Sequence, residues 1–79
     1  MAIEADVKLD CYGLLCPVPI IQTARKMKEM KVGEVLEVVS TDAGIKVDMP
    51  AWCRMTGQEF MGFEEAGDII RVFVRKLRD

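Results

Sequence analysis

Asp10-Cys-Tyr-Gly-Leu-Leu-Cys-Pro-Val-Pro19 joins a short apolar stretch to a long amphipathic one, and it decides the fold. Proline is unfavourable inside a helix. It is favourable in the first turn, because its fixed φ suits the helix and the N–H it lacks would have no partner there. Pro17 and Pro19 therefore predict a helix start with Cys16 close to the N-cap. Gly13 permits the tight or left-handed turn that leads from a strand into this helix.

Cys16 is the candidate reactive residue of this stretch. A sulfur at a helix N-terminus lies at the positive end of the helix dipole, which favours thiolate over thiol. The dipole stabilises an exposed charge at this position by about 0.3–1 kcal/mol. Because one pKa unit corresponds to about 1.4 kcal/mol, the dipole alone lowers the pKa of the thiol by less than about one unit. Because Pro17 and Pro19 lack an N–H, Val18 is the expected backbone donor to the sulfur. A thiol of this kind is suited to carrying a transferred group. The alternative interpretation is that Cys16 is a small buried residue before the helix. The two prolines and Gly13 favour the functional interpretation.

Composition and charge exclude several classes of protein. The 79 residues predict one small domain, and the hydrophobic fraction of 51% is enough for a compact core. The net charge of −2 comes from interspersed acids and bases, so we expect no direct binding of nucleic acid. No apolar run approaches the roughly 18 residues of a membrane helix, and the first residues lack a targeting pattern. We therefore expect no membrane association and a cytoplasmic location.

The chain has three cysteines, Cys11, Cys16 and Cys53, and no histidine. An odd number of cysteines does not form a closed disulfide framework, which fits a reducing compartment with at least one functional thiol. A Cys–His nucleophilic pair is impossible within the chain, and the cysteines lack the paired spacing of zinc sites. We expect no metal and no cofactor. Cys53 falls on the core side of a predicted helix, and we interpret it as a core thiol.

Hydrophobic periodicity predicts the order β-α-β-α-β-β along the chain. The expected strands cover residues 5–10, 34–40, 58–66 and 69–77, and the expected helices cover about 17–30 and 48–56. The first helix carries an apolar stripe of Ile20, Ile21, Ala24, Met27 and Met30. This order is satisfied by a two-layer α/β sandwich, in which two helices cover one face of a four-stranded mixed sheet.

Capping residues and alternation add detail to the second half of the chain. Asp48 is expected as the N-cap of the second helix, with Pro50 in its first turn and Gly57 as its C-terminal cap. Polar and apolar residues alternate in the last strand, so one face of the sheet is expected to be buried and the other to meet solvent. Phe73, together with Phe60 or Phe63, is expected on the open face. These rings are either scattered surface aromatics or part of a surface that binds a partner.

Residues 9–19 resemble the Asp-x-x-Gly-x-x-Cys-Pro-x-Pro signature, with its CPxP motif, of the TusA (SirA-like) sulfur carrier proteins. The likeness continues through Lys31-Val-Gly-Glu, Ser40-Thr-Asp-Ala-Gly, Asp48-Met-Pro-Ala-Trp-Cys and Gly57-Gln-Glu-Phe. Val32 and Gln58 replace the family's usual proline and histidine. The resemblance implies a single domain over residues 1–79, with a two-layer fold like the C-terminal domain of translation initiation factor three.

The resemblance also implies sulfur carriage. The family's cysteine takes sulfane sulfur from a persulfide donor such as a cysteine desulfurase or a rhodanese-like protein, holds it as a persulfide and passes it to a downstream acceptor protein. Family routes include tRNA thiolation, molybdenum cofactor supply and sulfur oxidation. Such a carrier turns over only with a partner on each side, so whether it is a sulfurtransferase enzyme is a matter of definition.

Carried over residue by residue, the resemblance makes Cys16 the persulfide carrier. Pro17 and Pro19 then hold the helix start, and Gly13 shapes the loop. Asp10 either anchors the strand end or the loop amides, or is an ordinary exposed acid.

Two other functions remain open. Cys11 could resolve a persulfide or form a regulatory disulfide, which would make the chain a thiol–disulfide redox module using Cys11 and Cys16. We favour Cys11 as a residue that fills the strand end, because Cys-x4-Cys is not the usual redox spacing. The third hypothesis is a non-catalytic regulatory or interaction domain that docks partners through a charged helix face with Arg25 and Lys26. A carrier must also dock, so this face is a candidate for either function.

Overall fold

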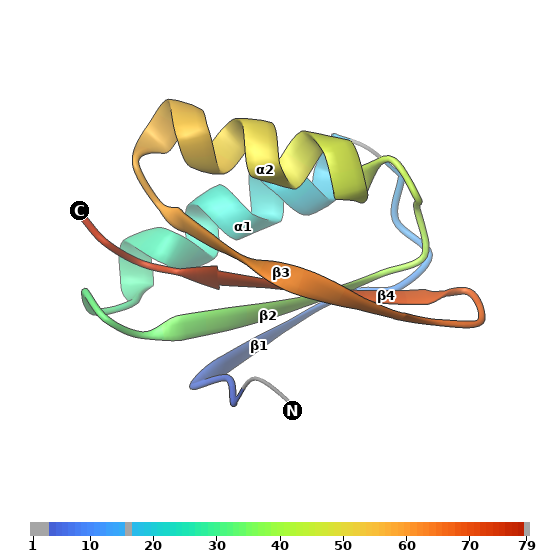
Figure 1. Cartoon of the computed structure of the whole chain (residues 1–79), viewed down its shortest axis with the longest axis horizontal. Coiled ribbons are helices and arrows are strands. Elements are labelled where there is room, and N and C mark those ends of the chain that lie inside the picture. The colour runs from blue at the N-terminus through green and yellow to red at the C-terminus, as the bar shows by residue number, and fades with distance from the viewer. Residues whose placement is uncertain (1–3, 16, 79) are drawn as a thin grey trace.

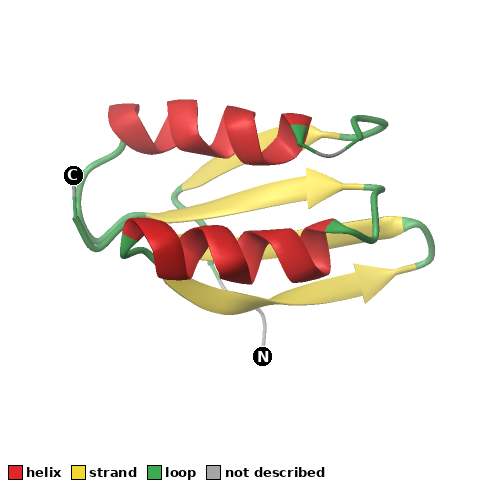
Figure 2. Ribbon diagram, turned by 90° about the horizontal axis from the view of Figure 1, so that it is seen from above, coloured by secondary structure: helices red, strands yellow, loops and turns green. Residues whose placement is uncertain are grey.

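The structure is a computed structural model that describes residues 4–15 and 17–78. Within these residues the elements are β1 (Val7–Cys11), α1 (Val18–Glu29), β2 (Val35–Ser40), α2 (Ile45–Thr56), β3 (Glu59–Ala66) and β4 (Ile69–Arg75). Both helices lie on the same face of the sheet (Figures 1 and 2). The predicted two-layer α/β sandwich and the order of its elements are confirmed.

The strand order in the sheet is β1-β2-β4-β3. β1 pairs with β2 in parallel, and β4 pairs in antiparallel fashion with both β2 and β3. The last rung of the parallel pair joins Cys11 to Ser40, so the carboxyl ends of β1 and β2 lie at one edge of the sheet. The helices begin at this same edge (Figure 1). The loop after β1, residues 12–17, is called the cysteine loop below, and it leaves the sheet beside the β2–α2 turn.

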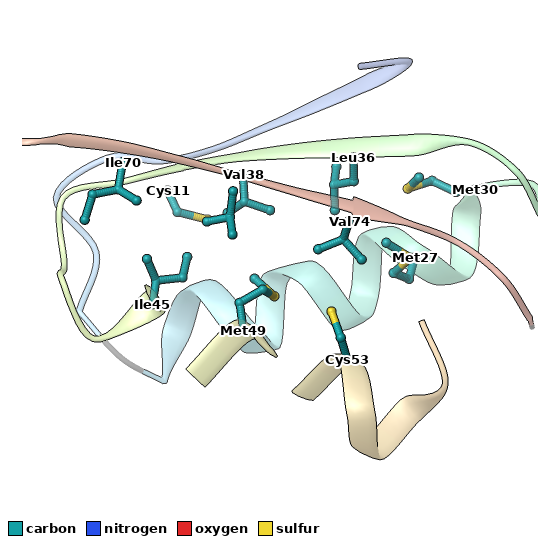
Figure 3. Close-up of a cluster of buried hydrophobic side chains, with 11 residues drawn as sticks. Cys11, Met27, Met30, Leu36, Val38, Ile45, Met49, Cys53, Ile70 and Val74 are labelled. Carbon is teal, nitrogen blue, oxygen red and sulfur yellow. The ribbon is translucent and has the colours of Figure 1, made fainter. Parts of the chain in front are cut away.

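The main core lies between the sheet and the two helices (Figure 3). Its buried members are Cys11, Met27, Met30, Leu36, Val38, Ile45, Met49, Cys53, Ile70, Val72 and Val74. Burial of this apolar surface is the main favourable contribution to folding, at roughly 25 cal/mol per Å². The interpretation of Cys53 as a core thiol agrees with this packing, as do Met27 and Met30 of the predicted stripe.

The buried face of α1 is rotated from the predicted stripe. Pro19, Thr23 and Met27 are its buried residues, whereas Ile21 is 46% exposed. The Thr23 hydroxyl is accommodated because its Oγ1 donates a 2.8 Å hydrogen bond to the carbonyl oxygen of Pro19. The prediction for Ile21 was wrong because hydropathy alone kept Thr23 out of the predicted buried stripe. The hydroxyl of Thr23 can be buried because the helix backbone accepts its hydrogen bond.

The second helix begins earlier than predicted, at Ile45, and Gly44 is its N-cap. Asp48 therefore lies in the first turn of α2, and Pro50 lies inside the helix. The turn before the helix is already ordered, because the N–H of Gly44 donates a 3.0 Å bond to Asp42 Oδ1. Placing Asp48 at the N-cap was wrong, whereas Gly57 does cap the C-terminus with a left-handed φ of 79°.

The open face of the sheet has a buried centre of its own. Phe73 alternates with the core residues of β4, yet it is only 1% exposed. It pairs across the sheet with Glu37, whose carboxylate lies 3.9 Å from Lys8 Nζ and 3.8 Å from Arg71 Nε. The residue opposite Phe73 in the neighbouring strand is therefore ion-paired to two basic side chains. The expectation that this face simply meets solvent was wrong at Phe73.

The other two phenylalanines lie elsewhere. Phe60 packs against the main core on the helix side of the sheet. Phe63 is 45% exposed, and Lys46 Nζ of α2 lies 5.8 Å from the centre of its ring. The pairing of Phe63 with the core residue Val72 places it on the helix side of β3. Neither aromatic joins Phe73 to form a surface on the open face.

Candidate functional site

The cysteine loop begins with three consecutive backbone amides that all have acceptors. The N–H of Tyr12 donates a 2.9 Å hydrogen bond to Asp10 Oδ1, and the N–H of Leu14 donates a 3.1 Å bond to the carbonyl of Cys11. The N–H of Gly13 donates a 3.1 Å bond to Thr41 Oγ1. Asp10 is exposed and holds a loop amide, which is the anchoring geometry considered for it from the sequence.

Gly13 lies in the turn that begins this loop. Its φ is +78°, a conformation that costs an L-residue roughly 1–2 kcal/mol and glycine almost nothing. A Cβ added at Gly13 would meet no heavy atom within 4 Å, so the requirement is conformational and not one of space. The loop-shaping geometry expected for Gly13 is present, and its functional role remains a prediction.

Pro17 is the N-cap of α1, with φ −96° and ψ 14°, and Pro19 is buried in the first turn. The N–H groups of Ile20 and Ile21 both donate 3.1 Å bonds to the carbonyl of Pro17, so the helix starts where the two prolines predict. Cys16, the predicted persulfide carrier, lies outside the described residues. The residues on either side of it, Leu15 and Pro17, are both exposed.

The sequence proposed Val18 as the backbone donor to the sulfur, and the structure does not support this assignment. The N–H of Val18 donates a 3.0 Å hydrogen bond to the carbonyl of Leu15 instead. A helix start leaves several N–H groups without intrahelical partners, and this bond gives one of them an acceptor in the turn that connects the loop to α1. The amides of residues 12, 13, 14 and 18 thus all have protein acceptors.

Cys11 and Cys53 are both buried in the main core (Figure 3). Burial raises the pKa of the Cys11 thiol above its ordinary value, and the negative charge of Asp10 raises it further. Burial also raises the pKa of Cys53 to about 11. A thiol must be deprotonated to act as a nucleophile, so neither residue is activated at neutral pH. This geometry fits Cys11 as a residue that fills the strand end.

Four exposed apolar side chains lie shortly before and at the start of α1 along the chain, and sequence reasoning missed them as a group. We call them the apolar rim: Tyr12 (63% exposed), Leu15 (72%), Val18 (37%) and Ile21 (46%). They come from the cysteine loop and the first turn of α1, on both sides of Cys16 in sequence. The apolar run through the Cys-Pro-x-Pro motif was the sequence signal that could have identified them. They were missed because hydropathy assigned Ile21 to the core.

Arg25 and Lys26 lie further along α1. Arg25 is exposed, and Lys26 Nζ lies 3.6 Å from the Glu29 carboxylate in an i,i+3 pair on the helix surface. An exposed pair of this kind contributes at most about 1 kcal/mol. Within residues 4–15 and 17–78 no group of three His, Cys, Asp or Glu side chains has a metal-binding arrangement. No helix in the described part of the chain is long and apolar enough to cross a membrane.

The mixed sheet with two helices on one face defines a class of small α/β domains. The crystal structure of a SirA-like protein from Desulfitobacterium hafniense has the same fold, with a TM-score of 0.78 over 91% of this chain and 99% of that chain. Its sequence is 19% identical, so this similarity shows the fold alone. It confirms the fold class predicted from the sequence.

The sequence then assigns the family. The family model described as "Sulfurtransferase TusA" matches residues 7–76, and the chain belongs to the TusA (SirA-like) family of sulfur carrier proteins. It is 38% identical over 73 residues to the putative sulfur carrier protein YrkI of Bacillus subtilis, covering 92% of this chain and 97% of that one. It is 37% identical over 73 residues to the sulfur carrier protein TusA of Allochromatium vinosum, again covering 92% of this chain and 96% of that one.

Another relative is considerably longer. The putative sulfur carrier protein YrkF of Bacillus subtilis is 48% identical over 73 residues, which cover 92% of this chain but 40% of YrkF. The same kind of domain therefore occurs both as most of a short chain and as part of a longer one.

Proposed function

We propose that this chain carries sulfane sulfur as a persulfide on Cys16. The observation that supports this most directly is the local geometry: Pro17, the residue after Cys16 in sequence, is the N-cap of α1, and Asp10 and Thr41 accept hydrogen bonds from the amides of Tyr12 and Gly13 in the loop before it. Membership of the TusA family supports the same function. Sulfur exchange requires a thiolate and an accessible sulfane sulfur, and it does not require an internal base.

The chemistry is two exchanges of one sulfur atom. The Cys16 thiolate attacks the outer sulfur of a donor persulfide; a new S–S bond forms, the donor's S–S bond breaks, and the donor leaves as a thiolate with the bonding electron pair. In the second exchange a nucleophile on the acceptor attacks the outer sulfur of the Cys16 persulfide, and Cys16 leaves as the thiolate. Both steps conserve charge and need no external oxidant or reductant.

The partners in this proposal are proteins. The donor is a persulfide-bearing protein such as a cysteine desulfurase or a rhodanese-like protein, and the acceptor is a downstream protein of tRNA thiolation, molybdenum cofactor supply or sulfur oxidation. We place the docking surface on the apolar rim, with Arg25 and Lys26 as a charged flank on the same helix. The expected setting is a reducing, cytoplasmic one, because three cysteines, an odd number, do not form a closed disulfide framework.

The deciding experiment is the intact mass of the protein after incubation with a cysteine desulfurase and cysteine. Wild-type protein should gain the mass of one sulfur atom, and Cys16→Ser should gain none. Cys11→Ala and Cys53→Ala should load as the wild type does, because both thiols are buried and protonated. Loading of Cys16→Ser would show that the carrier residue is assigned wrongly.

The redox hypothesis receives less support. A thiol–disulfide module would need Cys11 as a second reactive thiol, but its side chain is fully buried and its pKa is raised. A loss of two hydrogens on mild oxidation of the wild type, absent in Cys11→Ala, would restore that hypothesis.

A further inference from the structure

The cysteine loop is tied to the rest of the molecule through one side chain that belongs to a different turn. The amides of Tyr12 and Leu14 donate to acceptors in β1, the strand that the loop has just left. The amide of Gly13 donates instead to Thr41 Oγ1, which is 28 residues away in sequence. Among the amides of residues 12–14, the Gly13 bond is thus the one that crosses to another segment.

This contact follows from the parallel pairing of the first two strands. Cys11 and Ser40 form the last rung between β1 and β2, so the chain leaves both strands at the same edge of the sheet. Gly13 lies two residues beyond that rung and Thr41 one residue beyond it. Figure 1 shows the two connections side by side, next to the starts of both helices.

Thr41 lies in a turn that is itself held in place. The N–H of Asp42 donates a 3.1 Å bond to Ser40 Oγ, and the N–H of Gly44 donates a 3.0 Å bond to Asp42 Oδ1. Ser40 is fully buried, so this turn is anchored in the core before α2 begins. The hydroxyl of Thr41 therefore connects the turn at Gly13 to a corner of the sheet that is anchored in the core.

We propose that Thr41 is a positioning residue for the Cys16 site: its hydroxyl fixes the Gly13 amide and thereby the conformation from which Cys16 takes up sulfur. The inference rests on the proposed function of Cys16. Without the hydroxyl, the Gly13 N–H turns to water, and the glycine, which tolerates many backbone conformations, lets the loop leave the productive one. A hydrogen bond of this kind is worth enough to change the productive population about three- to tenfold.

The test measures sulfur uptake from inorganic polysulfide, which needs no docking protein. In this reaction the Cys16 thiolate takes one sulfur atom, an S–S bond of the polysulfide breaks, and the shortened polysulfide leaves with the electron pair. Thr41→Val removes the acceptor at constant shape and should slow uptake about three- to tenfold. Thr41→Ser keeps the hydroxyl and should restore uptake to within about twofold of the wild-type rate.

Thr56→Val is the matched control. Thr56 Oγ1 donates a 2.8 Å bond to the carbonyl of Trp52 in α2, so this variant also loses one threonine hydrogen bond, in the last turn of a helix whose first turn lies beside the site. It should take up sulfur at the wild-type rate. Hydrogen exchange of the Gly13 amide should accelerate in Thr41→Val and stay unchanged in Thr56→Val. Thr41→Ala, which removes the same acceptor with a smaller side chain, serves if the valine does not fold.

The outcomes separate the two proposals. Wild-type uptake in Thr41→Val and Thr41→Ala, with none in Cys16→Ser, would overturn the role of Thr41 and leave the carrier function standing. Equal slowing in Thr41→Val and Thr41→Ser would also overturn it, because the serine hydroxyl should rescue. Uptake by Cys16→Ser would overturn the carrier function itself.

Discussion

Lys76 Nζ donates a 2.7 Å hydrogen bond to the carbonyl oxygen of Met27, 49 residues earlier in the chain. The same ammonium donates a 2.6 Å bond to the carbonyl of Met30, and the Lys76 residue is 3% exposed. The last carbonyls of a helix lack the usual i+4 donor: Met27 accepts a 3.2 Å bond from the N–H of the C-cap Met30, and the ammonium supplies a further donor. A cation there also interacts favourably with the helix dipole. A side chain from the segment after β4 thus caps the C-terminus of α1, the end of the helix that is remote from Cys16.

Lys76→Met should lower the free energy of unfolding by about 1–3 kcal/mol, because buried carbonyl oxygens would lose a charged donor. Urea denaturation measures the change. Lys28→Met is the control: Lys28 is an exposed lysine in the same last turn of α1, and its loss should cost less than about 1 kcal/mol. Equal losses in the two variants would contradict a specific role for the buried ammonium.

Gly13→Ala should destabilise the fold by about 1–2 kcal/mol, because an L-residue is strained at the φ of Gly13. Gly33→Ala is matched to it: the φ of Gly33 is +97°, and a Cβ there also meets nothing within 4 Å. Both variants should lose similar stability in urea, but only Gly13→Ala should change the rate at which iodoacetamide alkylates Cys16. A similar change of alkylation in Gly33→Ala would mean that general loosening, and not the loop, controls the thiol.

The stability of the protein should fall as the pH rises from about 9 to about 11. Burial raises the pKa of Cys53 from the ordinary value of 9.0 to about 11, so in this range the unfolded chain loses the thiol proton and the folded chain keeps it. The unfolded state is therefore favoured as pH increases, by an amount on the order of 2 kcal/mol. Urea denaturation across this range should show a shallower decline for Cys53→Val than for the wild type. Parallel declines would show that Cys53 is not responsible.

Leu15→Ser should slow sulfur transfer from a protein donor while leaving uptake from inorganic polysulfide unchanged. The leucine is 72% exposed on the apolar rim, so its removal affects docking more than stability. Met55→Ser is the control, since Met55 is 84% exposed in the last turn of α2, at the other end of the helix layer. Initial rates at several donor concentrations should show a raised KM for Leu15→Ser alone. Equal effects in both variants would remove the rim as the docking surface.

Much of the fold could be predicted because its signals are local. The alternation in β4, the helical spacing in α1, the prolines at 17 and 19 and the cap at Gly57 each depend on a few neighbouring residues. The start of α2 was predicted wrongly because a local signal was misleading there. Asp48 and Pro50 form a local cap pattern, but the turn at Asp42 and Gly44 had already begun the helix.

The candidate site divides in the same way. Cys16 and its prolines were singled out by residue type and spacing, and the role of Cys16 stays a prediction because this residue lies outside the described part of the chain. The acceptor of the Gly13 amide could not be predicted, because Thr41 is 28 residues away and no sequence pattern pairs the two turns. Nor could the acceptor of the Val18 amide, which is the carbonyl oxygen of Leu15 in a short turn.

The sequence by itself determined the type and order of the elements and the helix start that follows Cys16, since backbone propensities, periodicity and proline geometry act over one or two turns of chain. Only the tertiary structure decided that Thr41 holds Gly13, that Lys76 closes α1 and that Phe73 is buried on the open face. These three contacts depend on the strand order β1-β2-β4-β3, which brings together segments that are distant in sequence. Their physical basis is non-local burial and the need to give polar groups hydrogen-bond partners, and both are settled only when the layers pack.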